Sequence, residues 1–144
     1  MSRRVLIIDD DAAIREVLQV VLEEESYEVI PAENGTAALE RLERVIPDLI
    51  VVDLVMPSMN GYTFLNLLQQ RGDHLSTLPT IVFTASTTAP QEVEQIEAAG
   101  YIYLAKPFEI DELLAKIKEL LNLPVTDPRY QQRHLPLTAP RKSA

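Results

Sequence analysis

Short apolar runs alternate along the chain with longer stretches in which apolar residues recur every three or four positions. Runs of about four apolar residues between turn signals are typical of strands buried on both faces, and the longer stretches have helical spacing. The sequence predicts strands at 5–8, 27–30, 49–52, 80–83 and 101–104, and helices at 12–25, 35–45, 62–71, 90–99 and 109–121. Five strand-then-helix units in succession predict a parallel sheet with helices on both faces.

Composition of the predicted strands indicates their order in the sheet. The run at 27–30 contains Glu28 and the run at 101–104 contains two tyrosines, so these two strands suit the edges. With right-handed crossovers, the natural order is 2-1-3-4-5. The expected fold class is α/β, a doubly wound, five-stranded parallel sheet of flavodoxin-like order, with a ligand crevice at the carboxyl ends of strands 1 and 3.

Apolar residues fall on one side of the first and last predicted helices. Residues three and four positions apart lie on the same face of a helix, so we expect these faces to pack against the sheet. The residues are Ile14, Val17, Leu18, Val21 and Leu22 in the first helix, and Leu113, Leu114, Ile117, Leu120 and Leu121 in the last.

The overall composition narrows the class of protein. At 144 residues the chain is one domain's worth and contains no cysteine, which excludes disulfides and Cys-based zinc sites. A net charge of −9 argues against a direct nucleic-acid surface. No apolar run is long enough for a signal peptide or a membrane span, so we expect a soluble, cytoplasmic protein. The helical pattern stops near residue 122; we expect a domain at 1–123 and a Pro-rich C-terminal extension at 124–144, flexible or docked.

Polar residues follow four of the predicted strands. Asp9, Asp10 and Asp11 follow the first strand, Asp53 the third, Thr84 the fourth and Lys106 the fifth. Because parallel strands deliver their carboxyl ends to the same edge, these side chains are expected to be neighbours. Carboxylates gathered there repel one another unless a cation lies between them, and hard oxygen ligands suit Mg²⁺ or Mn²⁺.

Each of these residues also has a purely structural interpretation. Asp11 is suited to cap the first helix, and Thr84 is an ordinary strand residue. Lys106 and its following proline suit a turn into the last helix. The dipeptide at Asn60 and Gly61 is typical of a turn in which the glycine takes a positive φ. Four polar positions at four matching strand ends nevertheless favour a functional site over chance.

The chain resembles the receiver domain of two-component response regulators. The segments that carry the resemblance are VLIIDDDAAIREVL, DLIVVDLVMPSMNG, TIVFTAS and YLAKPF, in the expected order over roughly residues 4–121. The resemblance implies a phosphoacceptor switch, not an enzyme acting on a separate substrate. Its phosphodonor would be a histidine kinase or a histidine phosphotransfer protein.

The resemblance also implies a role for each site residue. Asp53 is similar to the phosphoacceptor, and Asp9 and Asp10 to the acidic pair that holds Mg²⁺ together with Asp53. Val55 would offer its backbone carbonyl to the metal. Thr84 and Lys106 resemble the hydroxyl and the ammonium that hold the phosphoryl group, and a cis bond is expected between Lys106 and Pro107. Tyr103 resembles the aromatic residue that turns inward when Thr84 moves.

Three functions remain open at this point. The first is the phosphoacceptor switch, with output by protein contact or by a homodimer through the face of the fourth helix, fifth strand and fifth helix. The second is a haloacid-dehalogenase-type phosphatase, because Asp9-x-Asp11 superficially fits its nucleophile motif; Ala12 and Ala13 then stand where a hydroxyl is needed, and Asp53 is unused. The third is a receiver-like interaction module that is never phosphorylated.

Overall fold

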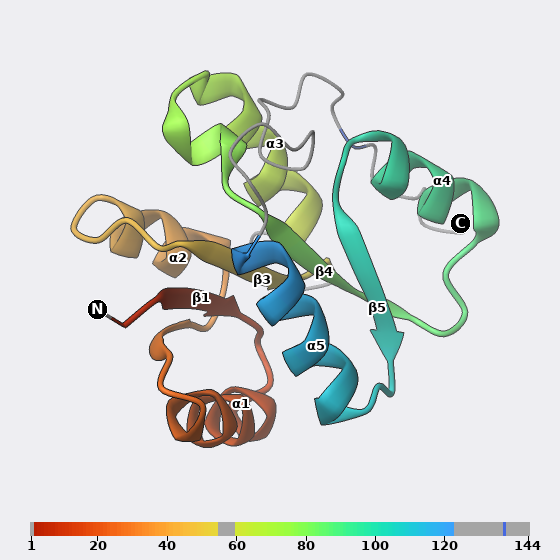
Figure 1. The fold of residues 1–144 in the computed structure, drawn as a ribbon. Coiled ribbons are helices and arrows are strands. Elements are labelled where there is room, and N and C mark those ends of the chain that lie inside the picture. Colours follow the sequence, from red (N-terminus) through yellow and green to blue (C-terminus); the bar gives the residue numbers. More distant parts are fainter. Residues whose placement is uncertain (1, 55–59, 123–136, 138–144) are drawn as a thin grey trace.

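The chain forms a five-stranded parallel sheet covered by helices on both faces (Figure 1). This computed structural model describes residues 2–54, 60–122 and 137. The strands are β1 (Arg4–Ile8), β2 (Glu28–Ala32), β3 (Leu49–Asp53), β4 (Thr80–Ala85) and β5 (Ile102–Lys106). The helices are α1 (Ala12–Glu24), α2 (Gly35–Leu42), α3 (Gly61–Arg71), α4 (Pro90–Ala98) and α5 (Ile110–Leu121), and a short 3-10 helix, η1 (His74–Thr77), precedes β4.

The sheet has the predicted order, β2-β1-β3-β4-β5, with every pair of neighbours parallel. The two less apolar strands lie at the edges, as expected from their composition. β2 also contains Pro31, which has no N–H to donate and is therefore best tolerated in an edge strand. Successive strands are added on one side of β1 and then on the other, so the strand order reverses between β1 and β3. A ligand crevice is expected where these two strands end.

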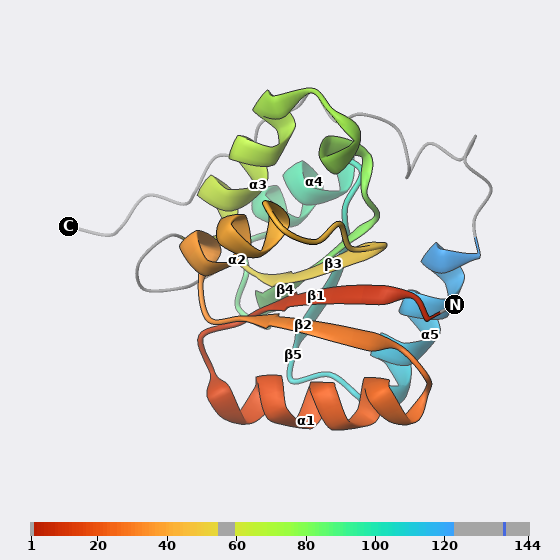
Figure 2. The ribbon, with the colours of Figure 1, turned by 90° about the vertical axis from the view of Figure 1, so that its left-hand side faces the viewer.

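Two apolar clusters lie on opposite faces of the sheet (Figure 2). Helices α2, α3 and α4 cover one face, and α1 and α5 cover the other. Successive residues of a strand point to opposite faces, so Leu6 and Ile8 of β1 belong to the first cluster, and Val5 and Ile7 to the second. The central strands are therefore apolar throughout, as the continuous runs in the sequence indicated.

Side-chain caps begin three of the helices. Asp11, Asn34 and Asn60 each accept hydrogen bonds from backbone N–H groups in the first turn of α1, α2 and α3. These N–H groups have no partner inside the helix, so a cap at this position stabilises the helix start. The longest described helix, α1, has 13 residues. Among the described residues, no helix has the length and apolar character needed to cross a membrane.

The structure differs from the sequence expectations in several places. β2, β4 and β5 end two residues later than predicted, at Ala32, Ala85 and Lys106, and α2 ends at Leu42, three residues before its predicted end. The 3-10 helix η1 was not predicted; Asp73 caps it. Val17 was expected to pack against the sheet but is 51% exposed, because Leu18 and Leu22 take the inner positions of α1.

Leu137 lies far along the chain from the helices but is part of the core. It is 3% exposed and belongs to the apolar cluster on the α2, α3 and α4 face. Its backbone N–H donates to Asn66 Oδ1 at 2.7 Å, and its carbonyl accepts from Asn66 Nδ2 at 2.6 Å.

Candidate functional site

Three carboxylates meet at the carboxyl edge of the sheet. Asp9 follows β1 directly, Asp10 comes next, and Asp53 is the last residue of β3. One oxygen from each residue lies within 4.8 Å of the others. Asp9 is fully buried, whereas Asp10 is exposed and the side chain of Asp53 is 14% exposed. The cluster is therefore buried at Asp9 and open to solvent at Asp10 and Asp53.

The ammonium of Lys106 bridges two of these carboxylates. Its Nζ lies 2.9 Å from Asp9 Oδ2 and 2.8 Å from Asp53 Oδ2, although the three residues come from three separate strand ends. Burial by itself would lower the pKa of Lys106, but hydrogen bonds and charge attraction from Asp53 and Asp9 outweigh it and raise the pKa above its usual value of 10.5. Lys106 therefore stays charged at neutral pH and offsets part of the repulsion among the acids.

The ammonium of Lys106 lies over an aromatic ring that packs against a second one. Its Nζ lies 5.4 Å from the centroid of the Phe83 ring, and the rings of Phe83 and Phe108 are 4.6 Å apart. Phe83 pairs in register with Asp53, so the ring lies beside the acid on the same edge of the sheet. The bond between Lys106 and Pro107 is cis, as predicted. The sequence reasoning missed the two rings, although both stand in the segments TIVFTAS and YLAKPF.

Asp11 does not join the acid cluster. Its side chain accepts from the N–H groups of Ala13 at 2.9 Å and Ile14 at 3.3 Å, and so caps α1. Its own N–H donates to Asp9 Oδ1 at 3.0 Å. Arg15, four residues further along α1, donates from Nη1 to the carbonyl of Asp9 at 2.6 Å. Arg15 is thus a second positive group beside Asp9 that the sequence reasoning did not identify. Its position one helical turn after the cap Asp11 could have indicated that its side chain reaches back to the end of β1.

Thr84 and Tyr103 share one side of the sheet. Thr84 is 5% exposed and lies on β4, one residue beyond Phe83 and between the strands that carry Asp53 and Lys106. Tyr103 is half-buried, pairs with Val82 and packs against the cluster on the α2, α3 and α4 face. Because side chains alternate along a strand, Val82, Thr84 and Tyr103 point to the same face. Val55, the remaining predicted site residue, lies outside the described residues.

Gly61 has a different role from the one its sequence suggested. Its φ is not positive, since it is the first residue of α3 after the Asn60 cap. A Cβ on Gly61 would lie 2.5 Å from the Asp53 carbonyl oxygen and 2.7 Å from Leu54 Cα. Glycine is therefore required for close approach, because α3 begins against the backbone of the central acid. The position of Gly61 in the sequence, eight residues after Asp53, does not reveal this close approach.

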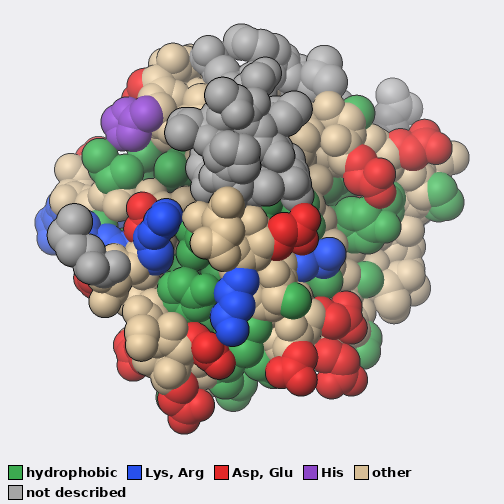
Figure 3. Space-filling model, viewed as in Figure 1, with side chains coloured by type: hydrophobic (Ala, Val, Ile, Leu, Met, Phe, Trp, Pro, Cys, Tyr) green, Lys and Arg blue, Asp and Glu red, His purple; other side chains and the backbone are tan. Residues whose placement is uncertain are grey.

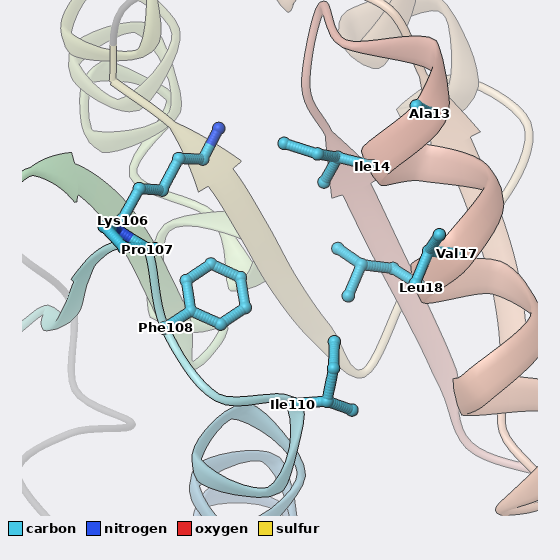
Figure 4. A pocket seen from close by; sticks show the side chains of 8 residues that line it. All are labelled: Ala13, Ile14, Val17, Leu18, Lys106, Pro107, Phe108 and Ile110. Carbon is cyan, nitrogen blue, oxygen red and sulfur yellow. The ribbon is translucent and has the colours of Figure 1, made fainter.

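An apolar groove of about 510 Å³ opens beside Lys106 (Figure 4). Residues of α1 form one wall, and residues from Lys106 to the start of α5 form the other. In Figure 4 the amine of Lys106 points away from Phe108, toward the end of the strands. Figure 3 shows hydrophobic side chains exposed among many acidic ones on the side viewed in Figure 1. The lining residues are Ala13, Ile14, Val17, Leu18, Lys106, Pro107, Phe108 and Ile110.

The acid cluster fits a small divalent cation. Mg²⁺ binds oxygens at about 2.0–2.1 Å in octahedral geometry, so oxygens on one ion are about 2.9 Å apart in neighbouring positions and about 4.1 Å apart in opposite ones. One oxygen from each of the three carboxylates lies within 4.8 Å of the others, close to the separation of two ligands on one ion. The exposure of Asp10 leaves room for water ligands, which Mg²⁺ usually retains. Asp9, Asp10 and Asp53 are therefore a chemically suitable donor set.

Comparison with known proteins agrees with this geometry. Residues 5–118 match the model of the response regulator receiver domain. The response regulator MprA of Mycobacterium ulcerans is 39% identical over 121 residues, which cover 84% of this chain and 51% of MprA. The chain thus spans about half the length of that relative.

Solved structures show the same similarity. A putative response regulator from Chloroflexus aurantiacus superimposes with a TM-score of 0.75 at 35% identity, covering 84% of this chain and 98% of that one. The response regulator TrrA of Thermotoga maritima, solved in complex with Mg²⁺ and BeF, gives a TM-score of 0.69 at 33% identity over 82% and 98% of the two chains.

Fold and site together define an α/β signalling domain with an acidic pocket at the carboxyl edge of its sheet. The chain belongs to the family of response regulator receiver domains. Phosphorylation and Mg²⁺ are typical of this family.

Proposed function

We propose that Asp53 is the phosphoacceptor of a two-component or phosphorelay switch. The observation that carries this proposal is the position of Lys106, whose ammonium bridges the buried Asp9 and the partly exposed Asp53. Asp53 is the central acid, it remains accessible, and its charge is held in place by a cation. A carboxylate in this setting is positioned to attack an incoming phosphorus atom.

The proposed reaction is the transfer of one phosphoryl group from a phosphohistidine. A carboxylate oxygen of Asp53 forms a bond to phosphorus, the bond from phosphorus to the histidine nitrogen breaks, and its electron pair returns to the imidazole. Lys106 and the hydroxyl of Thr84 are proposed to hold the phosphoryl oxygens. In a separate hydrolysis step water attacks phosphorus, the bond from phosphorus to the Asp53 oxygen breaks, and the Asp53 carboxylate and free phosphate are released. The domain thus catalyses only its own phosphorylation and dephosphorylation.

Asp9, Asp10 and Asp53 are proposed to hold Mg²⁺ or Mn²⁺, together with the backbone carbonyl of Val55. When bound, the ion neutralises charge on the phosphoryl oxygens and orients the group for transfer. The buried Asp9 is fixed by hydrogen bonds from the N–H of Asp11 and by Lys106, so it offers a preset ligand position.

The groove beside Lys106 is the proposed docking site of the phosphodonor. It is apolar and leads to the ammonium that contacts Asp53, so a helix of a histidine kinase or phosphotransfer protein seated there brings its phosphohistidine to the acid. Val17 lines this groove and is 51% exposed, so its side chain is available for contact with the donor while α1 stays in place. Such a donor places the proposed action in the cytoplasm.

Thr84 and Tyr103 are proposed to relay phosphorylation to a protein-binding face. The two residues share one side of the sheet, and Tyr103 lines a groove of about 450 Å³ between α4, β5 and α5. Movement of Thr84 toward a phosphoryl group leaves space into which Tyr103 turns, and the groove changes shape. The groove carries Glu97, Glu112 and Lys116, and charges of both signs suit a two-fold contact with a second copy.

Alternative functions receive less support from the geometry. A haloacid-dehalogenase mechanism needs Asp11 beside its nucleophile, but Asp11 caps α1. A module that is never phosphorylated gives no reason for a cluster of three acids that is open to solvent at Asp10 and Asp53.

The proposal is tested by incubating the protein with acetyl phosphate and Mg²⁺ and measuring its intact mass. We expect one phosphoryl group on the wild type and none on Asp53→Asn, whereas Asp11→Asn is expected to retain the modification. Unchanged mass in the wild type, or equal labelling of the Asp53 variant, would reject Asp53 as the acceptor. Loss of p-nitrophenyl phosphate turnover in Asp9→Ala but not Asp53→Ala would favour the phosphatase instead.

A further inference from the structure

Leu137 is held by a contact that recognises main chain and side chain together. The side-chain amide of Asn66 accepts from the N–H of Leu137 and donates to its carbonyl, at 2.7 and 2.6 Å. An asparagine amide presents an acceptor oxygen and a donor N–H side by side, as a peptide unit does, so Asn66 pairs with the backbone of Leu137. The Leu137 side chain enters the apolar cluster and leaves the residue 3% exposed. The two features together are typical of a peptide-binding site.

The site lies on the part of α3 that faces α4. Asn66 is one turn from Tyr62 and three residues from Gln69, so the three share a helix face. Tyr62 donates from its hydroxyl to Glu92 of α4 at 3.1 Å, and Gln69 donates to the hydroxyl of Tyr101 at 2.9 Å. Figure 2 shows α3 and α4 side by side on this face of the sheet. The groove beside Lys106 lies on the α1 and α5 side instead.

Charge favours binding of the C-terminal segment to its own domain. Residues 123–144 contain four basic residues and one aspartate, a net charge of +3, whereas residues 1–122 contain nine basic and 21 acidic residues, a net charge of −12. The opposite charges attract the segment to the domain at long range. The covalent link adds an effective concentration on the order of millimolar, so even a weak site is occupied within one chain.

We propose that α3 carries a binding site for the C-terminal segment of the same chain, with Leu137 as its anchor and Asn66 as the group that pairs with its backbone. The site is occupied within one molecule, and it closes this part of the α3 and α4 surface to other proteins. The proposal is independent of phosphorylation at Asp53.

Amide hydrogen exchange by NMR on the full chain tests the proposal. The N–H of Leu137 is expected to be protected in the wild type, and Asn66→Ala is expected to speed its exchange by about tenfold or more, because its acceptor is removed. Thr63→Ala is the matched control: Thr63 is exposed on the same helix, and its backbone N–H still donates to Asn60. It is expected to leave the exchange of Leu137 unchanged.

A second variant approaches the same contact from the other partner. Leu137→Asp places a charge in the apolar cluster and is expected to shift the side-chain amide resonances of Asn66 while the strands of the sheet keep their exchange rates. Exchange of the wild-type Leu137 N–H at the rate of an unfolded chain would overturn the proposal, as would equal effects of Asn66→Ala and Thr63→Ala. Protection that falls on dilution, with dissociation of a dimer, would overturn binding within one chain in favour of exchange between copies.

Discussion

Replacement of Gly61 by alanine tests how closely α3 is coupled to the phosphoacceptor. The new Cβ would lie 2.5 Å from the carbonyl oxygen of Asp53 and 2.7 Å from Leu54 Cα, and ordinary contact begins at 3.4 Å. Both obstacles are backbone atoms, so no side-chain rotation relieves the overlap. The backbone of β3 or the start of α3 must therefore move by about 0.7–0.9 Å, the difference between these distances.

The cost of this movement can be divided between stability and activity. Overpacking of this kind costs about 1–3 kcal/mol. Alanine has a better helix propensity than glycine, which offsets at most about 1 kcal/mol of this cost. We therefore expect Gly61→Ala to lower the unfolding free energy by about 1–2 kcal/mol. A misplacement of about 1 Å at a reacting group slows a reaction by about 100-fold, and we expect phosphorylation of Asp53 to slow by about 10- to 100-fold.

Two measurements separate these effects. Urea unfolding gives the stability, and intact mass after addition of acetyl phosphate gives the initial rate of phosphorylation of the folded protein. Gly35→Ala is the matched control, because Gly35 also follows an asparagine cap as the first residue of a helix, α2. We expect it to keep the wild-type rate. A folded Gly61→Ala protein that is phosphorylated at the wild-type rate would refute the close coupling of α3 to Asp53.

Three further substitutions test the charges and contacts around the site. Lys106→Met is expected to lower the unfolding free energy by about 3 kcal/mol in urea, because the buried Asp9 loses its counter-charge; a loss below about 1 kcal/mol would contradict this. Asp10→Asn is expected to raise the Tm without Mg²⁺ by reducing repulsion, and to shrink the Tm gain on adding Mg²⁺; an undiminished gain would exclude Asp10 as a ligand. Tyr62→Phe removes the hydrogen bond to Glu92 and is expected to cost about 1 kcal/mol, more than Glu92→Gln, which retains an acceptor; equal losses in urea would argue against a role of the hydroxyl.

Much of the site was predictable because a parallel sheet turns sequence position into spatial position. Asp9, Asp53 and Lys106 follow three apolar runs, and strands of one direction must bring such residues to one edge. The prediction for Asp11 as a helix cap was also sound, since the N–H groups at the start of α1 need an acceptor. The cis bond before Pro107 came from the family resemblance, because the apolar pattern carries no information on peptide isomers.

The parts that were missed depend on distances between separate segments. Val17 was assigned to the buried face because helical periodicity defines a broad stripe, but only the packing of α1 on the sheet shows that Leu18 and Leu22 occupy the inner positions. Gly61 was assigned to a positive φ because asparagine-glycine pairs often form turns. Its actual constraint is the backbone of Asp53, which lies across a loop.

The alternation of apolar runs and helical stretches determined the class of fold, the order of the strands and the edge at which the acids meet. These features follow from local periodicity and from the few connections that a parallel sheet permits. Tertiary structure alone decided that one ammonium bridges Asp9 and Asp53, residues 97 and 53 positions away from Lys106. It also brought Leu137 to Asn66, 71 positions away. Such contacts depend on the twist of the sheet and on side-chain packing, which set separations of a few ångströms that no pattern along the chain records.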